Sequence, residues 1–339
     1  MKSNYIKFTY LFILVFSFVQ CNSQKDNQQE LQSHKKILKL MGTRFEISAT
    51  SSDQSAAVDA VNKGVAEIER IENIISSWLP DSQTSAINAN AGIQAVVVDE
   101  ELFELIKRSK KISQLTNGAF DISFASMERL YKFDRQDHEL PSDSIRENAI
   151  SKINYQDIIL DEEKKSVFLK EKGMRIGFGG IGKGYAANKA KALMKDLPNI
   201  QGGVVNASGD LIVWGKSKST DGWPVQISDP KNPNKSIGWL SIKEASVVTS
   251  GDYEKYFTNN GRRYAHIIDP KTGLPTTGIK SVTVISPDTE IGDALATSVF
   301  VLGEEKGMEL INQLKNIEAV IITDDDRILK SKNIELNEN

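Results

Sequence analysis

This 339-residue chain has little cysteine, little net charge and no long apolar run, and each of these features excludes a class of protein or a means of stabilising the fold. A single cysteine, Cys21, allows no disulfide within the chain, so the fold must be held by its hydrophobic core. The net charge is only −3 with the two signs well mixed, which leaves no basic surface typical of nucleic-acid binding. The one conspicuous apolar run, residues 8–19, is too short to span a bilayer comfortably.

That apolar run is instead typical of an export signal. Lys2 and Lys7 form the positive start, and residues 8–19 form the hydrophobic core of a signal peptide over residues 1–20. Cys21 follows directly, as in a bacterial lipoprotein, so we expect Cys21 to be the lipidated first residue of the mature chain. Because Gln20 replaces the small residue usual before such a cysteine, an ordinary signal peptide with a buried free Cys21 stays open as an alternative.

Residues 21–36 are polar and lack periodicity, which predicts a flexible tether. The rest of the chain is long enough for one large domain or two intimately associated lobes, and we expect the latter. Hydrophobic periodicity predicts helices over residues 55–75, from Asp99 to about 117 and over 185–197. Strands are predicted over 37–49 (interrupted at Met41-Gly42-Thr43), 166–176, 204–214, 224–228, 237–242, 246–249, 264–268, 280–286 and 319–323, with two short helices before the last of these. This order indicates an α+β fold with mostly antiparallel sheet.

A glycine-rich stretch, Gly177-Phe-Gly-Gly-Ile-Gly-Lys-Gly184, precedes one predicted helix. It has the spacing of a nucleotide-binding P-loop except that Gly184 stands where a magnesium-binding Ser or Thr is required, which argues against a P-loop NTPase. A glycine turn into a helix start still offers amides and a positive dipole to a phosphate, and Lys183 adds a positive charge. The alternative is a turn that only brings the helix close to a sheet.

A histidine stands before a tight turn in Gly261-Arg-Arg-Tyr-Ala-His-Ile-Ile-Asp-Pro-Lys-Thr-Gly273. Asp269 and Pro270 are typical turn residues, and His266 would enter the turn from a strand. Imidazole titrates near neutrality, so we expect His266 to assist proton transfer or to steady a phosphoryl group. A structural histidine bonded to the turn is the alternative.

An Asp/Thr pair lies in the next predicted helix, which we expect to end at Gly303. Asp293 and Thr297 are four residues apart and therefore share one helical face. Carboxylate and hydroxyl oxygens are ligands that magnesium or calcium prefers. The alternative is that Asp293 is simply the N-cap of the helix.

Taken together, these segments resemble one family, the ApbE flavin transferases, or FAD:protein FMN transferases. The resemblance rests on eight segments in family order: Met41-Gly42-Thr43, Ser77-Trp78 with Asp81-Ser82, Thr116–Asp121, Gly177–Ala187, Asn206–Asp210, Thr249–Tyr253, Tyr264–Gly273 and Asp293–Thr297. It implies a T-fold-like α+β domain over residues 37–330, followed by a tail over 331–339.

The resemblance also implies the site. A metal ion, Mg²⁺ or else Ca²⁺, would be bound by Asp293, Thr297 and the backbone carbonyl of Gly180. The catalytic residues would be His266, Asp293 and Lys183. The flavin nucleotide would contact Met41, Trp78, Ala119, Phe120, Asp121, Gly177, Lys183 and Ile267. Gly177 departs from the family, which usually has Asp there, and without the family match Trp78 and Phe120 read as core aromatics.

The implied activity is transfer of FMN from FAD to a threonine hydroxyl of an acceptor protein, with release of AMP. A metal-dependent FAD pyrophosphatase and a non-enzymatic FAD-binding lipoprotein are the alternatives. The resemblance implies acceptors among the flavin-carrying subunits of membrane redox complexes. The predicted signal and lipidated Cys21 imply a location in the bacterial cell envelope, with a lipid anchor in a membrane and the catalytic domain in the periplasm.

Overall fold

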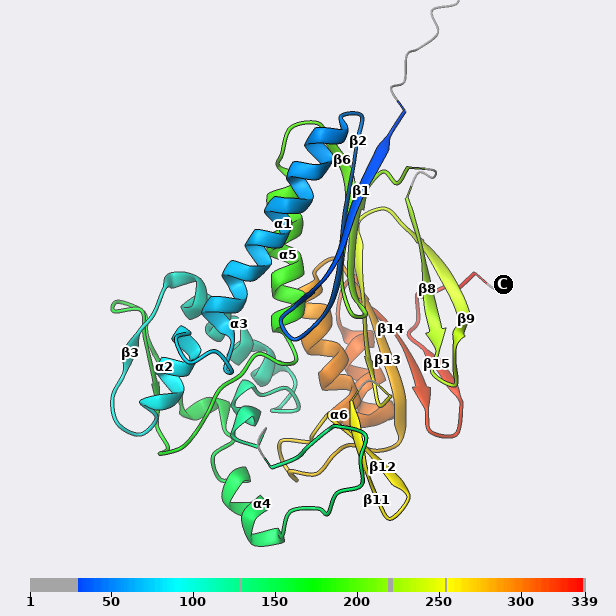
Figure 1. The fold of residues 1–339 in the computed structure, drawn as a ribbon. Helices are drawn as coiled ribbons and strands as arrows, with labels where there is room; N and C mark the ends of the chain where they lie inside the picture. Colours follow the sequence, from blue (N-terminus) through cyan, green and yellow to red (C-terminus); the bar gives the residue numbers. More distant parts are fainter. Residues whose placement is uncertain (1–29, 128–129, 219–221, 254, 338–339) are drawn as a thin grey trace, which may run out of the picture. The chain divides into compact units, whose positions relative to one another are not determined.

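An eight-stranded antiparallel sheet organises the chain (Figure 1). The computed structural model describes residues 30–127, 130–218, 222–253 and 255–337. In sheet order the strands are β1 (Gln32–Leu40), β2 (Thr43–Ser51), β6 (Ile200–Ala207), β7 (Asp210–Gly215), β10 (Ala245–Gly251), β13 (Ile279–Ser286), β14 (Glu318–Thr323) and β15 (Ile328–Lys330).

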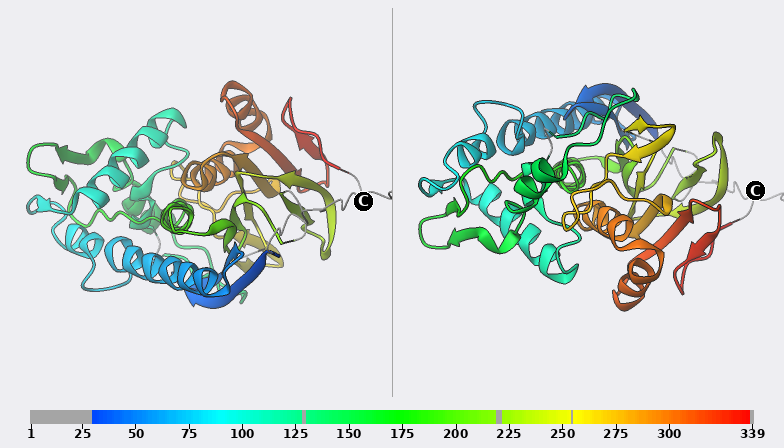
Figure 2. Two further views of the ribbon diagram at one scale, coloured as in Figure 1. Left: turned by 90° about the horizontal axis from the view of Figure 1, so that it is seen from above. Right: turned by 90° about the horizontal axis from the view of Figure 1, so that it is seen from below.

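Three helices cover one face of this sheet and a two-stranded ribbon covers the other (Figures 1 and 2). The helices are α1 (Gln54–Ile75), α5 (Gly182–Lys195) and α6 (Thr289–Gln313). The ribbon consists of β8 (Trp223–Asp229) and β9 (Asn232–Ile242), and it packs on β7 and β10 through apolar side chains such as Val213, Val225, Ile242 and Val247.

The segment between β2 and β6 adds smaller elements. These are α2 (Gln83–Ala89), β3 (Val96–Val97), α3 (Glu100–Leu115), the 3₁₀ helix η1 (Ile122–Ser126), α4 (Asp143–Ile150), a second 3₁₀ turn η2 (Tyr155–Asp157), β4 (Ile158–Asp161) and β5 (Ser166–Leu169). A second hairpin, β11 (Tyr256–Asn259) and β12 (Arg262–Ala265), lies between β10 and β13 in the sequence.

The predicted α+β class with mostly antiparallel strands is confirmed. Two lobes are not distinguished, because residues 31–339 form one compact unit by their contacts. No helix within the described residues combines the length and the apolar character needed to cross a membrane.

The interruption at Met41-Gly42 is a turn between two strands. Met41 (φ 48°) and Gly42 (φ 74°) both adopt left-handed backbone, which a two-residue hairpin requires, and Leu40 pairs with Thr43. The prediction of a single strand over 37–49 was therefore wrong. The tether predicted over residues 21–36 extends too far, because β1 begins at Gln32 and pairs with β2 along its whole length.

Other predicted boundaries also change. The strand predicted over 204–214 is two strands, joined by a turn at Ser208 (φ 56°) and Gly209 (φ 108°). The strand predicted over 166–176 ends at Leu169, and α5 begins at Gly182 instead of residue 185. The first helical part of α6 ends at Gly303 (φ 82°), where the helix was predicted to end. A second helical part follows this kink and continues to Gln313.

Candidate active site

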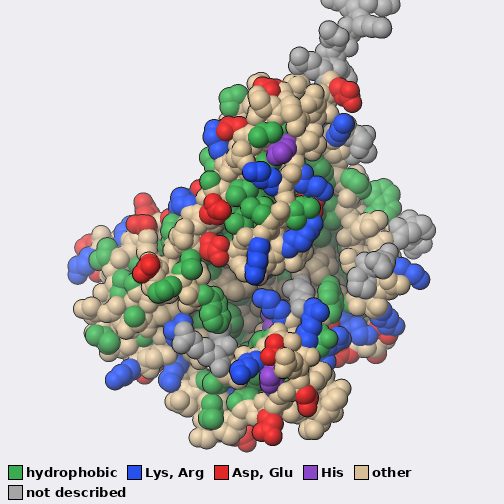
Figure 3. All heavy atoms as spheres, viewed as in Figure 1, with side chains coloured by type: hydrophobic (Ala, Val, Ile, Leu, Met, Phe, Trp, Pro, Cys, Tyr) green, Lys and Arg blue, Asp and Glu red, His purple; other side chains and the backbone are tan. Residues whose placement is uncertain are grey.

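One cavity of about 610 Å³ brings most of the predicted site residues together. It is lined by the β1–β2 turn, the end of α1, the glycine-rich loop, the start of α5, α6 and the segment after β12. Figure 3 shows this face of the molecule, which is hollowed below the β1–β2 hairpin. The predicted residues that line the cavity are Met41, Trp78, Ala119, Phe120, Asp121, Gly180, Lys183, His266, Ile267, Asp293 and Thr297.

Two predicted residues are not in this group. Gly177 does not line the cavity; it is buried, and its amide donates to the carbonyl of Ile122 at 2.9 Å. The expected contact between Gly177 and the nucleotide is therefore not supported. Cys21 lies outside the described residues.

The start of α5 touches α6 with almost no space between the backbones. A Cβ added to Gly184 would lie 2.2 Å from the carbonyl oxygen of Thr289 and 2.9 Å from the Cβ of Asp293. The position where a P-loop carries Ser or Thr therefore has to be glycine here. This close approach lets the Asp293 carboxylate accept a hydrogen bond from the Gly184 amide at 3.1 Å, so Asp293 caps α5 from the neighbouring helix.

Asp293 is not the N-cap of its own helix. Asp288 has that role, and its carboxylate accepts from the Ile291 amide at 3.0 Å. Asp293 lies inside α6 and is only 2% exposed. A buried carboxylate needs polar or charged partners, which indicates a role within the site.

Lys183 supplies the positive charge beside these carboxylates. Its Nζ lies 2.5 Å from Asp210 Oδ2 and 3.4 and 3.5 Å from the two carboxylate oxygens of Asp293. The three side chains come from the first turn of α5, the first residue of β7 and the interior of α6. The contact between these elements thus fixes one ammonium between two buried carboxylates.

The oxygen atoms near Asp293 suit a hard divalent cation. Thr297 lies one turn further along α6, and a Cβ built on Gly180 would lie 3.0 Å from the Thr297 hydroxyl, so the Gly180 backbone adjoins this face of the helix. Within the described residues there is no group of three or more His, Cys, Asp or Glu side chains that could hold a metal. A metal site here would combine the Asp293 carboxylate with the Thr297 hydroxyl and the Gly180 carbonyl, a set of oxygen ligands that fits Mg²⁺ or Ca²⁺.

His266 is held as a neutral imidazole. Burial lowers its pKa to about 4, and the positive charges of Lys255 and Lys183 act in the same direction. Its Nδ1 lies 3.1 Å from the carbonyl oxygen of Lys255. Because a carbonyl only accepts hydrogen bonds, Nδ1 carries the proton and Nε2 keeps its lone pair. This is the tautomer required of a general base.

The segment after α3 forms another part of the wall. Asp121 is a predicted nucleotide contact, but its carboxylate already accepts from the amide and hydroxyl of Ser123 and from the Tyr155 amide, at 2.8, 2.6 and 2.8 Å. Burial raises its pKa, which these hydrogen bonds partly oppose. Phe120 is 4% exposed and belongs to the core, whereas Trp78 is 68% exposed and is free to stack on a ligand.

Several lining residues were not assigned a role from the sequence. Asp210 lies in a segment that carries the family resemblance, but only the fold brings it to Lys183. Glu72 accepts a hydrogen bond from the Met41 amide at 2.9 Å and so fixes the hairpin turn against α1. Lys255 and Phe133 follow no recognisable motif, and nothing in the sequence indicated them.

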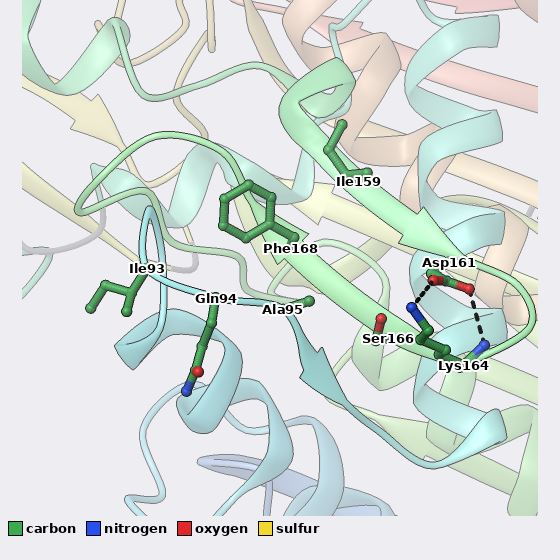
Figure 4. Close-up of a pocket in the computed structure, with 8 residues that line it drawn as sticks. All are labelled: Ile93, Gln94, Ala95, Ile159, Asp161, Lys164, Ser166 and Phe168. Carbon is green, nitrogen blue, oxygen red and sulfur yellow. Dashed lines mark hydrogen bonds and ion pairs between the residues drawn. The ribbon is translucent and has the colours of Figure 1, made fainter.

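A second depression is remote from this chemistry. It is lined by Ile93, Gln94, Ala95, Ile159, Asp161, Lys164, Ser166 and Phe168, around the small sheet of β3, β5 and β4 (Figure 4). Its charged groups, Asp161 and Lys164, pair with each other. None of the predicted site residues lines it.

The fold and the main cavity define a class of protein. It is an α+β protein that surrounds a small-molecule cavity with a glycine-rich helix start, a lysine ammonium between two buried carboxylates, and a neutral histidine. The model of the ApbE family matches residues 41–321. The chain belongs to the ApbE family.

Curated relatives support the assignment. The chain is 32% identical over 294 residues to a FAD:protein FMN transferase of Klebsiella pneumoniae (strain 342), covering 86% of this chain and 90% of the relative. It is 31% identical over 311 residues to a FAD:protein FMN transferase of Treponema pallidum (strain Nichols), covering 87% and 86%.

Solved structures agree with this assignment. The ApbE protein of Thermotoga maritima superimposes with a TM-score of 0.82 at 29% identity, covering 91% of this chain and all of that one. The flavinyl transferase ApbE of Pseudomonas stutzeri gives a TM-score of 0.78 at 25% identity, with 89% and 95% covered.

Proposed function

We propose that this protein is a FAD:protein FMN transferase. It moves the FMN part of FAD to a threonine hydroxyl of an acceptor protein, forms a phosphoester-linked flavin and releases AMP. The observation that carries the proposal is the convergence of Lys183, Asp293 and neutral His266 on one cavity. The names of the curated relatives support the same activity.

The side chains of this site match the charges of that reaction. The pyrophosphate of FAD is anionic, and Lys183 together with the first-turn amides of α5 provides positive charge beside it. Trp78 offers an exposed aromatic face to a flavin or adenine ring. A divalent cation at Asp293, Thr297 and the Gly180 carbonyl, Mg²⁺ in our proposal, would neutralise charge on the phosphate oxygens.

His266 has the role of the base. Its Nε2 accepts the proton of the threonine hydroxyl as the oxygen attacks the FMN-side phosphorus. The new bond joins the threonine oxygen to that phosphorus, and the broken bond is the one from this phosphorus to the bridging oxygen, which leaves with AMP. The hydrogen bond between Nδ1 and the Lys255 carbonyl holds the ring in the tautomer that permits this step.

The test uses the chain from Glu30 onward, because β1 begins at Gln32. The protein is incubated with FAD, Mg²⁺ and a threonine-bearing acceptor domain; the acceptor is weighed by intact-protein mass spectrometry and AMP is assayed. We expect a mass gain equal to an FMN phosphoester, lost on chelation of Mg²⁺ and absent from a Thr→Ala acceptor. Release of AMP and free FMN with the acceptor unmodified would indicate a pyrophosphatase, and intact FAD would indicate a binding protein.

We also propose that the protein works at a membrane surface of the bacterial cell envelope. A lipid on Cys21 and a short tether over residues 22–31 would keep the catalytic domain close to flavin-carrying subunits of membrane redox complexes. The signal-like sequence of residues 1–21 supports this proposal.

A further inference from the structure

Lys183 and the proposed cation depend on the same carboxylate. The Asp293 oxygens that would bind a divalent ion lie 3.4 and 3.5 Å from the Lys183 ammonium. Two positive charges this close repel each other strongly, because the carboxylates between them are almost fully buried and poorly screened by water. The lysine and the metal ion therefore compete for Asp293.

The lysine is placed at some electrostatic cost. It lies in the first turn of α5, where the helix dipole disfavours a positive charge. The two buried carboxylates offset this cost, and they in turn need a positive partner when no metal is bound. With Asp210, Asp293 and Lys183 ionised, these three groups carry a net charge of −1.

The contacts of Lys183 with Asp210 and with Asp293 differ in length. The distance to Asp210 Oδ2 is 2.5 Å, whereas the distances to Asp293 are longer by almost 1 Å. Asp210 lies on β7, a central strand of the main sheet, and is itself buried. Asp210 can consequently remain the ion-pair partner of Lys183 when Asp293 binds another cation.

We propose that Lys183 is a stand-in cation that neutralises Asp293 until a divalent ion binds there, and that Asp210 is the positioning residue that retains the lysine afterwards. This inference rests on the proposed function, because it requires the metal site. Binding of the ion changes the net charge of the three groups with the metal from −1 to +1. The cluster then favours the pyrophosphate of FAD, so the metal and the nucleotide bind cooperatively.

The first experiment measures binding of Mg²⁺ alone, without FAD, to metal-stripped protein by isothermal titration calorimetry. Lys183→Met removes the competing charge, so we expect it to bind Mg²⁺ about tenfold more tightly than the wild type. The matched control is Lys189→Met on the same helix; Lys189 faces Glu101 at 3.8 Å, does not line the cavity, and should leave the affinity unchanged. A Lys183→Met variant that binds Mg²⁺ no more tightly than the wild type overturns the proposal.

Stability provides an independent measurement. In EDTA, Lys183→Met leaves the two buried carboxylates without its ammonium, so its Tm should fall below that of Lys189→Met, and Mg²⁺ should restore most of the difference. If Lys183→Met is unfolded in EDTA, its affinity for Mg²⁺ is measured from its refolding. The variant is titrated with Mg²⁺ and the refolding is monitored by circular dichroism. A Tm of Lys183→Met that does not respond to Mg²⁺ overturns the proposal.

The role of Asp210 is tested by a double-mutant cycle. Asp210→Asn should weaken Mg²⁺ binding several-fold when Lys183 is present, because the lysine then rests on Asp293. The same substitution should weaken it much less in the Lys183→Met background. Equal losses in the two backgrounds overturn the anchoring role of Asp210.

These outcomes separate this inference from the proposed function. A wild type that binds no Mg²⁺ at millimolar concentration overturns the metal site, and with it both proposals. A wild type that binds Mg²⁺ while Lys183→Met gains no affinity overturns the stand-in role alone.

Discussion

At the scale of single residues, the imidazole of His266 is prepared to accept a proton at neutral pH. Its pKa of about 4 lies below the ordinary value of 6.5 because of burial and, to a smaller degree, because of Lys255 and Lys183. The base form is present above the pKa and is lost as the pH falls through it. We expect the FMN-transfer rate to stay flat from about pH 8 to pH 6 and to decline only as the pH approaches 4.

Two variants check this assignment. His266→Ala should reduce the transfer rate by about 10²- to 10⁴-fold, with FAD binding, measured by fluorescence, nearly unchanged. Lys255→Met should move the acidic limb of the pH–rate profile upward, since one positive charge near the ring is lost. An acidic limb centred near pH 6.5 in the wild type would contradict a depressed pKa.

Asp293 has a structural role as the acceptor for the Gly184 amide and, in our proposal, a chemical role, so Asp293→Ala should affect two measurements. The Gly184 amide and Lys183 lose their acceptor, which should lower the free energy of unfolding in urea by about 1–3 kcal/mol. Mg²⁺-dependent release of AMP should be abolished. The comparison is Asp288→Ala, which removes the N-cap of α6 at a cost of about 1 kcal/mol. Loss of AMP release in both variants would mean that α6 as a whole, and not Asp293, was disturbed.

At the scale of elements, the contact between α5 and α6 is the one that tolerates least change. Gly184→Ala would force its Cβ against the Thr289 carbonyl, so the helices must separate. We expect a loss of about 3 kcal/mol in unfolding free energy, at the upper end for overpacked sites, together with loss of transfer activity. Gly179→Ala is the control in the same loop, because its Cβ would meet only Phe124 at an ordinary 3.4 Å. Wild-type stability in Gly184→Ala would show that the helices can move apart freely.

Elements with a regular apolar period were predicted well, and turns that depend on left-handed backbone were not. Helix α1 and strand β13 follow from spacing alone, within about one residue. The hairpins at Met41 and Ser208 were missed because neither residue is typical of left-handed backbone, which the pairing of neighbouring strands imposes here. Helix α4 was missed because it has only eight residues, of which Ala149 alone is buried, and Ile145 is exposed, so no apolar period marks it.

The site residues were predicted from local sequence motifs. Residues that reach the site only through contacts between distant elements could not be predicted in this way. His266, Asp293, Thr297 and Lys183 stand in recognisable local patterns, and the fold brings them to one cavity. Asp210 acts through a contact between α5 and β7, which no local pattern encodes. The structure also rules out the interpretation of Asp293 as an N-cap, since the N-cap of α6 is Asp288, five residues earlier.

At the scale of the whole molecule, our proposal of membrane attachment rests on Cys21. The predicted lipid on this cysteine is the anchor to test. In Cys21→Ser the protein should move from the membrane pellet to the supernatant after cell fractionation, with FMN transfer per molecule in detergent unchanged. If Cys21→Ser stays in the pellet after a high-salt wash, the lipid is not the anchor.

The order of strands in the main sheet also has a consequence for folding kinetics. The second neighbour of β2 in the sheet is β6, and Phe45 pairs with Ala207. Helices α1 to α5 all lie between these two strands in the sequence. Such non-local pairing makes folding slow, because a long loop must close before the contacts form. During synthesis the N-terminal hairpin stays incomplete until β6 has emerged from the ribosome. A chain with this topology therefore remains unfolded for longer after synthesis. Slow folding suits passage through a membrane channel that admits only unfolded polypeptide, the route implied by the export signal predicted over residues 1–20.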